Sequence, residues 1–231
     1  MRRTFSDTER VVEYSQNIYF DNSYLHDQLK KAKPTFLVDI GANIGMSTLS
    51  LIEEFTSINK IIAIEAEIEN FKILKKNFKL WSQAYKEIDF LPIFGVATNS
   101  SELSMVEDDS LNSLTGSNSA SGTFRFKTIK ANNNNKNKMV KTIAVDSLFK
   151  DIKGEKVLLK VDIEGGEEIL FNNNVEWVKH CYFITLEIHD KFHPELINSS
   201  KNILKILNNG DFALAASKDV LYFYNRKKLF R

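Results

Sequence analysis

The sequence has little cysteine, no large excess of charge of either sign and no long hydrophobic run. Cys181 is the single cysteine, so no disulfide can form within the chain. It lies in the apolar run 181–184, where a buried structural thiol is expected rather than a nucleophile. Lysine and arginine (31 residues) nearly cancel aspartate and glutamate (30), so no basic excess is present to bind nucleic-acid phosphates. A small or neutral partner fits this balance better.

Hydrophobic residues are nowhere consecutive over the roughly 18 positions that a membrane span needs, so none is expected. The segment 1–10 begins with positive charge but continues into polar residues, without the apolar stretch of a signal peptide. We therefore expect a cytoplasmic protein. With 231 residues, 43% hydrophobic and 26% charged, the chain can bury the core of one globular domain.

Short apolar runs alternate with segments of helical spacing along most of the chain. Runs rich in β-branched residues are typical of strands buried on both faces of a parallel sheet, and the amphipathic segments predict helices packed on it. The predicted strands are 35–40, 60–64, 88–96, 156–161 and 182–188, and the predicted helices are 46–55, 68–80, 167–172 and 200–207. Two further runs, 211–216 and 220–224, predict an antiparallel hairpin at the sheet edge. The sequence thus predicts a doubly wound, Rossmann-like α/β fold with a mostly parallel sheet and a C-terminal antiparallel hairpin.

Two regions depart from this alternation. Residues 1–33 are predicted to form an N-terminal segment, a candidate helical lid, ahead of a main domain at 34–231. Serine, asparagine and glycine dominate an insertion at about 98–137, in which alternating residues at 122–129 predict a hairpin strand. The asparagine tract within this insertion is interpreted as a loop.

A glycine bend follows the first predicted strand. Gly41 allows the backbone to leave the strand in a tight turn, and Gly45 permits close helix packing or close approach of a ligand. Glu65 ends the next predicted strand, 24 residues after Gly41. Because ligands bind beyond the carboxyl ends of parallel strands, the bend and Glu65 should lie at the same edge. A carboxylate there can accept hydrogen bonds from both hydroxyls of an adenosine ribose.

The glycine spacing differs from the dinucleotide pattern Gly-x-Gly-x-x-Gly, since Asn43 and Met46 stand at its second and third glycine positions. A pyrophosphate cradle is therefore disfavoured. Asp39 beside the bend would repel phosphate but attract an ammonium or sulfonium group. S-adenosylmethionine carries both cations and a ribose, and we predict it as the cofactor. The predicted contacts are Asp39, Gly41, Ala42, Asn43, Gly45, Glu65, Ala66 and Val96.

A second polar group occupies 160–168, where a predicted strand runs into an acidic, glycine-containing turn. Glu167 and Glu168 fall in the first turn of the following helix, where the helix dipole favours negative charge. Asp162 and Glu164 precede that turn and lack this explanation. They belong to the same carboxyl edge as the glycine bend, which favours a catalytic or ligand-positioning role.

The next predicted strand ends in Glu187 and His189, which are two residues apart and should face the same side. An imidazole there can take the proton of a hydroxyl while a carboxylate orients it; the alternative is an exposed strand end. Together with Asp162, these residues can also bind a hard divalent metal. A metal is possible but not expected, because no compact metal motif is present. The predicted catalytic residues are Asp162, Glu164, Glu187 and His189.

The motifs together resemble those of FkbM-type methyltransferases. The resemblance rests on 38–45, 62–65, 159–167 and 185–189, in that order, and covers about 36–193. It implies a class I methyltransferase fold, S-adenosylmethionine as donor and a hydroxyl acceptor on a sugar, glycan or polyketide-like product. Ala66 stands where such proteins often have proline, and Gly166 where alanine is common, but neither departure removes a functional group.

The predicted function is therefore S-adenosylmethionine-dependent O-methylation of a hydroxyl on a sugar, glycan or secondary metabolite. One alternative is an NAD-dependent oxidoreductase on a related sheet, and another is a non-catalytic Rossmann-like binding module. Acceptor specificity would be set by the peripheral segments, which match no motif of the family. The acceptor and the oligomeric state therefore stay open.

Overall fold

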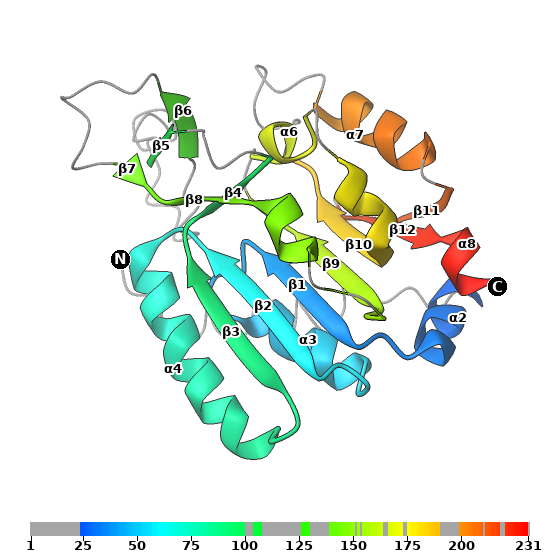
Figure 1. Ribbon diagram of the computed structural model, residues 1–231, viewed down its shortest axis with the longest axis horizontal. Coiled ribbons are helices and arrows are strands. Elements are labelled where there is room, and N and C mark those ends of the chain that lie inside the picture. Colours follow the sequence, from blue (N-terminus) through cyan, green and yellow to red (C-terminus); the bar gives the residue numbers. More distant parts are fainter. Residues whose placement is uncertain are drawn as a thin grey trace.

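The fold is built on a seven-stranded sheet with the strand order β11-β12-β10-β9-β1-β2-β3 (Figure 1). The computed structural model describes residues 24–99, 104–107, 126–129, 139–150, 152, 154–163, 166–172, 175–189, 199–209, 211–217 and 220–230.

Five neighbouring strands of this sheet run parallel. They are β1 (Phe36–Ile40), β2 (Lys60–Glu65), β3 (Asp89–Phe94), β9 (Val157–Val161) and β10 (Cys181–Glu187). At the other side, β12 (Val220–Asn225) pairs antiparallel with β10, and β11 (Phe212–Ser217) pairs antiparallel with β12. The predicted fold class, a mostly parallel α/β sheet with a C-terminal antiparallel hairpin, is confirmed.

Helices cover both faces of the sheet. On one face lie α2 (Tyr24–Ala32), α3 (Met46–Glu54) and α4 (Ile68–Ala84), and on the other lie the 3-10 helices η2 (Val145–Phe149) and η3 (Glu176–His180) together with α7 (Ser199–Asn209). All five residues of β1 are buried, with Val38 and Ile40 in one core and Leu37 in the other. This double burial explains why the strand is apolar at nearly every position.

The predicted strand 88–96 is wrong in one respect, because its residues are divided between two sheets. β3 ends at Phe94, and Gly95 then adopts a φ of +155°, at which a Cβ would lie 2.7 Å from the carbonyl oxygen of Lys141. The chain continues into β4 (Val96–Thr98), which pairs in parallel with β8 (Thr142–Ala144). The close backbone approach at Gly95 thus separates the two strands.

The insertion contributes a small antiparallel sheet. β5 (Ser104–Glu107) pairs with β6 (Phe126–Ile129) and with β7 (Met139–Val140). β6 covers the second half of the hairpin strand expected at 122–129, and residues 122–125 lie outside the described residues. The asparagine tract at 132–135 lies outside the described residues.

Of the predicted N-terminal segment 1–33, a candidate lid, the structure describes residues 24–33, most of which form α2, and residues 1–23 lie outside the described part. His26 Nε2 of this helix lies 2.8 Å from the Glu54 carboxylate, and the Lys156 ammonium donates to the carbonyl oxygen of Ala32. Glu54 ends α3, and Lys156 precedes β9. The helix therefore lies at the amino ends of the strands, opposite the glycine bend.

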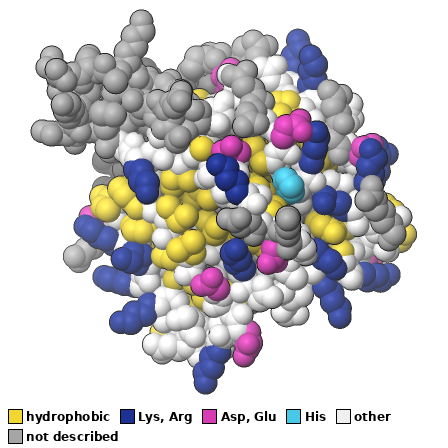
Figure 2. Space-filling view, viewed as in Figure 1, with side chains coloured by type: hydrophobic (Ala, Val, Ile, Leu, Met, Phe, Trp, Pro, Cys, Tyr) yellow, Lys and Arg dark blue, Asp and Glu magenta, His cyan; other side chains and the backbone are white. Residues whose placement is uncertain are grey.

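The edge strand β3 carries exposed hydrophobic side chains. Hydrophobic side chains gather over β3 on the face shown in Figure 2, and Leu91 of this edge strand is 47% exposed. No helix in the described ranges is both long and apolar enough to cross a bilayer.

Inside the fold, Cys181 is buried, and burial raises the pKa of its thiol, as expected of a structural cysteine.

α6 (Glu167–Leu170) and α8 (Arg226–Leu229) complete the described helices. α6 follows β9 along the chain and packs Leu170 into the same core as α7. It thereby brings its first residue, Glu167, to the carboxyl edge of the sheet, where the predicted site residues lie.

Candidate functional site

The glycine bend after β1 uses left-handed backbone at three positions. Gly41 has a φ of +79°, Asn43 of +54° and Gly45 of +94°. A Cβ at Gly41 would lie 1.8 Å from the carbonyl oxygen of Asp162, and one at Gly45 would lie 2.8 Å from Cδ1 of Leu74. Gly41 is therefore required by packing against the backbone at the end of β9, whereas Gly45 is favoured chiefly by its left-handed φ.

Glu65 ends β2 with its carboxylate turned to this bend. Its Oε2 accepts a hydrogen bond from the Asn43 amide at 2.8 Å, and its Oε1 accepts one from the Glu67 amide at 2.8 Å. The residue is only 8% exposed. Burial raises the pKa of Glu65, although the two amide donors and the charge of Lys160 oppose that increase. The bend and the predicted ribose-binding acid are thus in direct contact.

Asp39 lies beneath the bend and is fully buried. Its Oδ2 accepts a 2.5 Å hydrogen bond from the Thr48 hydroxyl, and its Oδ1 lies 3.2 Å from the Lys160 ammonium. Because Lys160 compensates the charge of Asp39 inside the protein, repulsion from its ammonium opposes any attraction of Asp39 for a cationic ligand. The predicted contact of Asp39 with a ligand stays a prediction.

Lys160 was missed by the sequence reasoning. It is 2% exposed, donates to the carbonyl oxygen of Gly41 at 2.8 Å and lies 3.6 Å from Oδ2 of Asp162. Its ammonium therefore connects the glycine bend to the end of β9. Lys160 is the single charged residue of the otherwise apolar strand 157–161, and this pattern could have revealed it. A lysine in a buried strand is almost never without a charged or polar partner.

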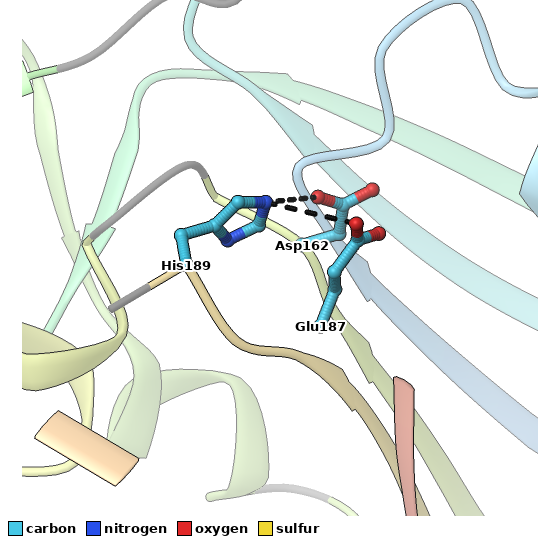
Figure 3. Close-up of side chains that lie close together, drawn as sticks. All are labelled: Asp162, Glu187 and His189. Carbon is cyan, nitrogen blue, oxygen red and sulfur yellow. Dashed lines mark ion pairs between the residues drawn. The ribbon is translucent and has the colours of Figure 1, made fainter. Parts of the chain in front are cut away.

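At the ends of β9 and β10 the structure brings together Asp162, Glu187 and His189. Nε2 of His189 lies 3.9 Å from Oδ1 of Asp162 and 3.8 Å from Oε1 of Glu187. Figure 3 shows this ring nitrogen turned towards both carboxylates. The imidazole is buried and the carboxylates are half-buried. Glu164, the fourth predicted catalytic residue, lies outside the described residues.

Glu167 supports His189 from the other side of the ring. Its Oε1 lies 2.8 Å from Nδ1 of His189, and the residue is 1% exposed. The helix dipole alone, which the sequence offered as the explanation, does not account for a carboxylate enclosed against an imidazole. An ionised carboxylate only accepts, so this contact favours the tautomer in which Nδ1 carries the proton and Nε2 carries the lone pair.

The remaining predicted contacts lie next to Glu65. Ala66 follows it directly, and the amide of Gly95 donates to the Glu65 carbonyl oxygen at 3.0 Å, which brings Val96 close to the end of β2. Ala42 is buried, whereas Ala66 and Val96 are half-buried. Their roles towards a ligand stay predictions.

A depression of about 540 Å³ also lies among the described residues, beside β8 and η2. None of the predicted site residues lines it. Glu65, whose pKa is raised, and the cluster of Asp162, Glu187 and His189 both lie at the carboxyl edge of the parallel strands. We therefore place the candidate site there and not in this depression.

Comparison with known protein families shows which family this chain belongs to. The family described as "Methyltransferase FkbM domain" matches residues 39–214, which includes the glycine bend, Glu65 and the Asp162–Glu187–His189 cluster. The chain belongs to the FkbM methyltransferase family. The resemblance identified from the sequence motifs is thereby confirmed. No curated protein matches the sequence.

A solved structure from the same family has the same fold. A crystal structure of methyltransferase FkbM from Methylobacillus flagellatus KT is 15% identical with a TM-score of 0.56, over 91% of this chain and 48% of that one. This chain thus spans about half the length of that FkbM methyltransferase. An O-methyltransferase from Bacillus cereus in complex with SAH is 12% identical with a TM-score of 0.47, over 95% of this chain and 89% of that one.

Proposed function

We propose that this protein is an S-adenosylmethionine-dependent methyltransferase that acts on a hydroxyl of a sugar, glycan or secondary metabolite. Membership of the FkbM family supports methyl transfer. The observation that carries the proposed cofactor is the buried carboxylate of Glu65, held against the glycine bend by the Asn43 amide.

The residues at the bend fit the donor. Each oxygen of Glu65 accepts one amide hydrogen bond and has a second lone pair, so the carboxylate can also accept from ribose hydroxyls. Gly41, Ala42, Asn43 and Gly45 would line the donor on one side. Ala66 and Val96, which lie next to Glu65, would line it on another.

When bound, S-adenosylmethionine supplies a methyl group on a positively charged sulfur, which an oxygen nucleophile can attack. The protein's part is alignment of the two reactants and removal of the hydroxyl proton. Asp162, Glu187 and His189 would face the acceptor, since the carbonyl of Asp162 is packed against Gly41 of the bend. The carboxylates near Nε2 and Nδ1 of His189 would orient its imidazole towards the acceptor hydroxyl.

Thermal unfolding with candidate ligands tests this proposal. S-adenosylhomocysteine, which lacks only the methyl group, should raise the melting temperature increasingly with concentration, because a ligand that binds only the folded state stabilises it. NAD should give no such increase. A shift with NAD but not with S-adenosylhomocysteine would favour an oxidoreductase, and no shift with either would favour a non-catalytic module.

A further inference from the structure

Asp162, Glu187 and His189 form a compact group of ligand atoms. One nitrogen or oxygen from each side chain lies within 4.8 Å of those of the other two. The three residues come from the ends of β9 and β10, adjacent parallel strands, and Figure 3 shows their polar atoms converging on one point. The sequence separation of 27 residues between Asp162 and His189 hid this closeness, since it matches no compact metal motif.

We propose that these three side chains bind one divalent metal ion. Metal–ligand bonds of about 2.1 Å allow two ligand atoms of one ion to lie up to about 4.2 Å apart. The distances from Nε2 of His189 to the two carboxylates, 3.9 and 3.8 Å, fall inside that limit, and the three ligand atoms lie within 4.8 Å of one another. The side chains would move closer together to close the site around an ion, since ligand atoms of a tetrahedral ion lie about 3.4 Å apart.

Glu167, which is outside the group of three, provides independent support. A histidine that binds a metal through one ring nitrogen usually donates its other N–H to a carboxylate or carbonyl, which fixes the ring. Glu167 occupies this position at 2.8 Å from Nδ1, and both residues are almost completely buried. Nε2 is thereby presented to Asp162 and Glu187 as a ligand atom.

Two oxygen ligands and one imidazole suit ions that accept both, such as Mn²⁺, Fe²⁺, Co²⁺ or Zn²⁺. Three protein ligands leave positions open for water or for an exogenous oxygen. The use of such a position for an acceptor hydroxyl rests on the proposed function. There the ion would lower the pKa of the hydroxyl, and His189 would act as a metal ligand instead of a base.

Titration of the metal-stripped protein with Mn²⁺ tests the site, with free Mn²⁺ followed by electron paramagnetic resonance. We expect saturable binding of one ion per chain. Asp162→Asn and His189→Ala should each lower the affinity at least tenfold, and Glu167→Ala should lower it roughly 10- to 100-fold, because Nδ1 of His189 loses its acceptor. Glu168→Gln, a neighbouring carboxylate outside the cluster, is the matched control and should bind Mn²⁺ like the unaltered protein.

Calorimetry with S-adenosylhomocysteine on the same proteins separates the metal site from the donor site and shows that each variant is folded. Absence of saturable Mn²⁺ binding to the unaltered protein would overturn the metal site, as would equal affinity in Asp162→Asn and His189→Ala. Either result together with normal S-adenosylhomocysteine binding would leave the proposed function standing. Mn²⁺ binding without S-adenosylhomocysteine binding would support the metal site and contradict the proposed cofactor.

Discussion

At the residue scale, the site is held by buried charged groups that compensate one another. Lys160 connects Asp39, the carbonyl oxygen of Gly41 and Asp162, while Glu167 fixes the imidazole of His189. Burial of a charge without such a partner would cost several kcal/mol, so each of these groups depends on its neighbours. Glu65 differs from them, because backbone amides are its closest partners.

The pH dependence of ligand binding follows from the raised pKa of Glu65. Ribose hydroxyls would donate to the ionised carboxylate, so affinity for S-adenosylhomocysteine should weaken as the pH falls through this raised pKa. The weakening should begin above pH 4.5, the ordinary value for glutamate. Calorimetry across this range on the unaltered protein and on Glu65→Gln measures it. Parallel pH profiles for the two proteins would contradict the role of the carboxylate.

The ligand-free protein should show the linked effect on stability. Because the pKa of Glu65 is higher in the folded state than in the unfolded state, its contribution is fully present below the unfolded pKa. That contribution is lost as the pH rises through the folded pKa. The free energy of unfolding of the unaltered protein should therefore fall relative to that of Glu65→Gln over this window, as denaturant titrations at several pH values would show.

At the element scale, the glycine bend and the end of β9 are fitted to each other. The carbonyl oxygen of Asp162 occupies the space that a Cβ at Gly41 would need, and the amide of Asp162 donates to the Ile40 carbonyl oxygen at 3.0 Å. The donor side and the acceptor side of the proposed site are thus in contact through backbone atoms. A side chain added at Gly41 would clash with this backbone, and no side-chain rotation could remove the clash.

Gly41→Ala should destabilise the fold by at least about 2 kcal/mol more than Gly154→Ala, since overpacking adds to backbone strain. Gly154 is the matched control because its φ of +84° resembles the +79° of Gly41, while nothing lies within 4 Å of its Cβ position. Chemical denaturation measures the free energy of unfolding of both variants. Equal losses would mean that the contact with β9 contributes nothing beyond backbone strain.

Much of this arrangement could be predicted from element patterns. The apolar runs at β1, β2, β9 and β10 are buried on both faces, so hydrophobicity alone located them. The division between β3 and β4 could not be found in this way, because an apolar run continues across Gly95 and only the three-dimensional approach of Lys141 separates the strands. The contact of Glu167 with His189 was likewise hidden, since it joins residues 22 positions apart.

At the scale of the whole molecule, the sheet topology assembles a site from distant parts of the chain. β1 lies between β2 and β9, and β10 lies beyond β9, so the ends of these four strands form one edge. Residues between Asp39 and His189 are thereby gathered at a place where open α/β sheets bind ligands. The family match covers this whole span. The sequence motifs identified this edge, but the closeness of Asp162, Glu187 and His189 could be seen only in the folded structure.

The central claim is that this edge binds an adenosine through Glu65. Calorimetric titration of the unaltered protein and of Glu65→Ala with S-adenosylhomocysteine tests it most directly. We predict binding of one ligand per chain, weakened in Glu65→Ala by about 1 to 3 kcal/mol because the ribose hydroxyls lose their acceptor. Equal affinity in the two proteins, or no binding to the unaltered protein, would contradict the account.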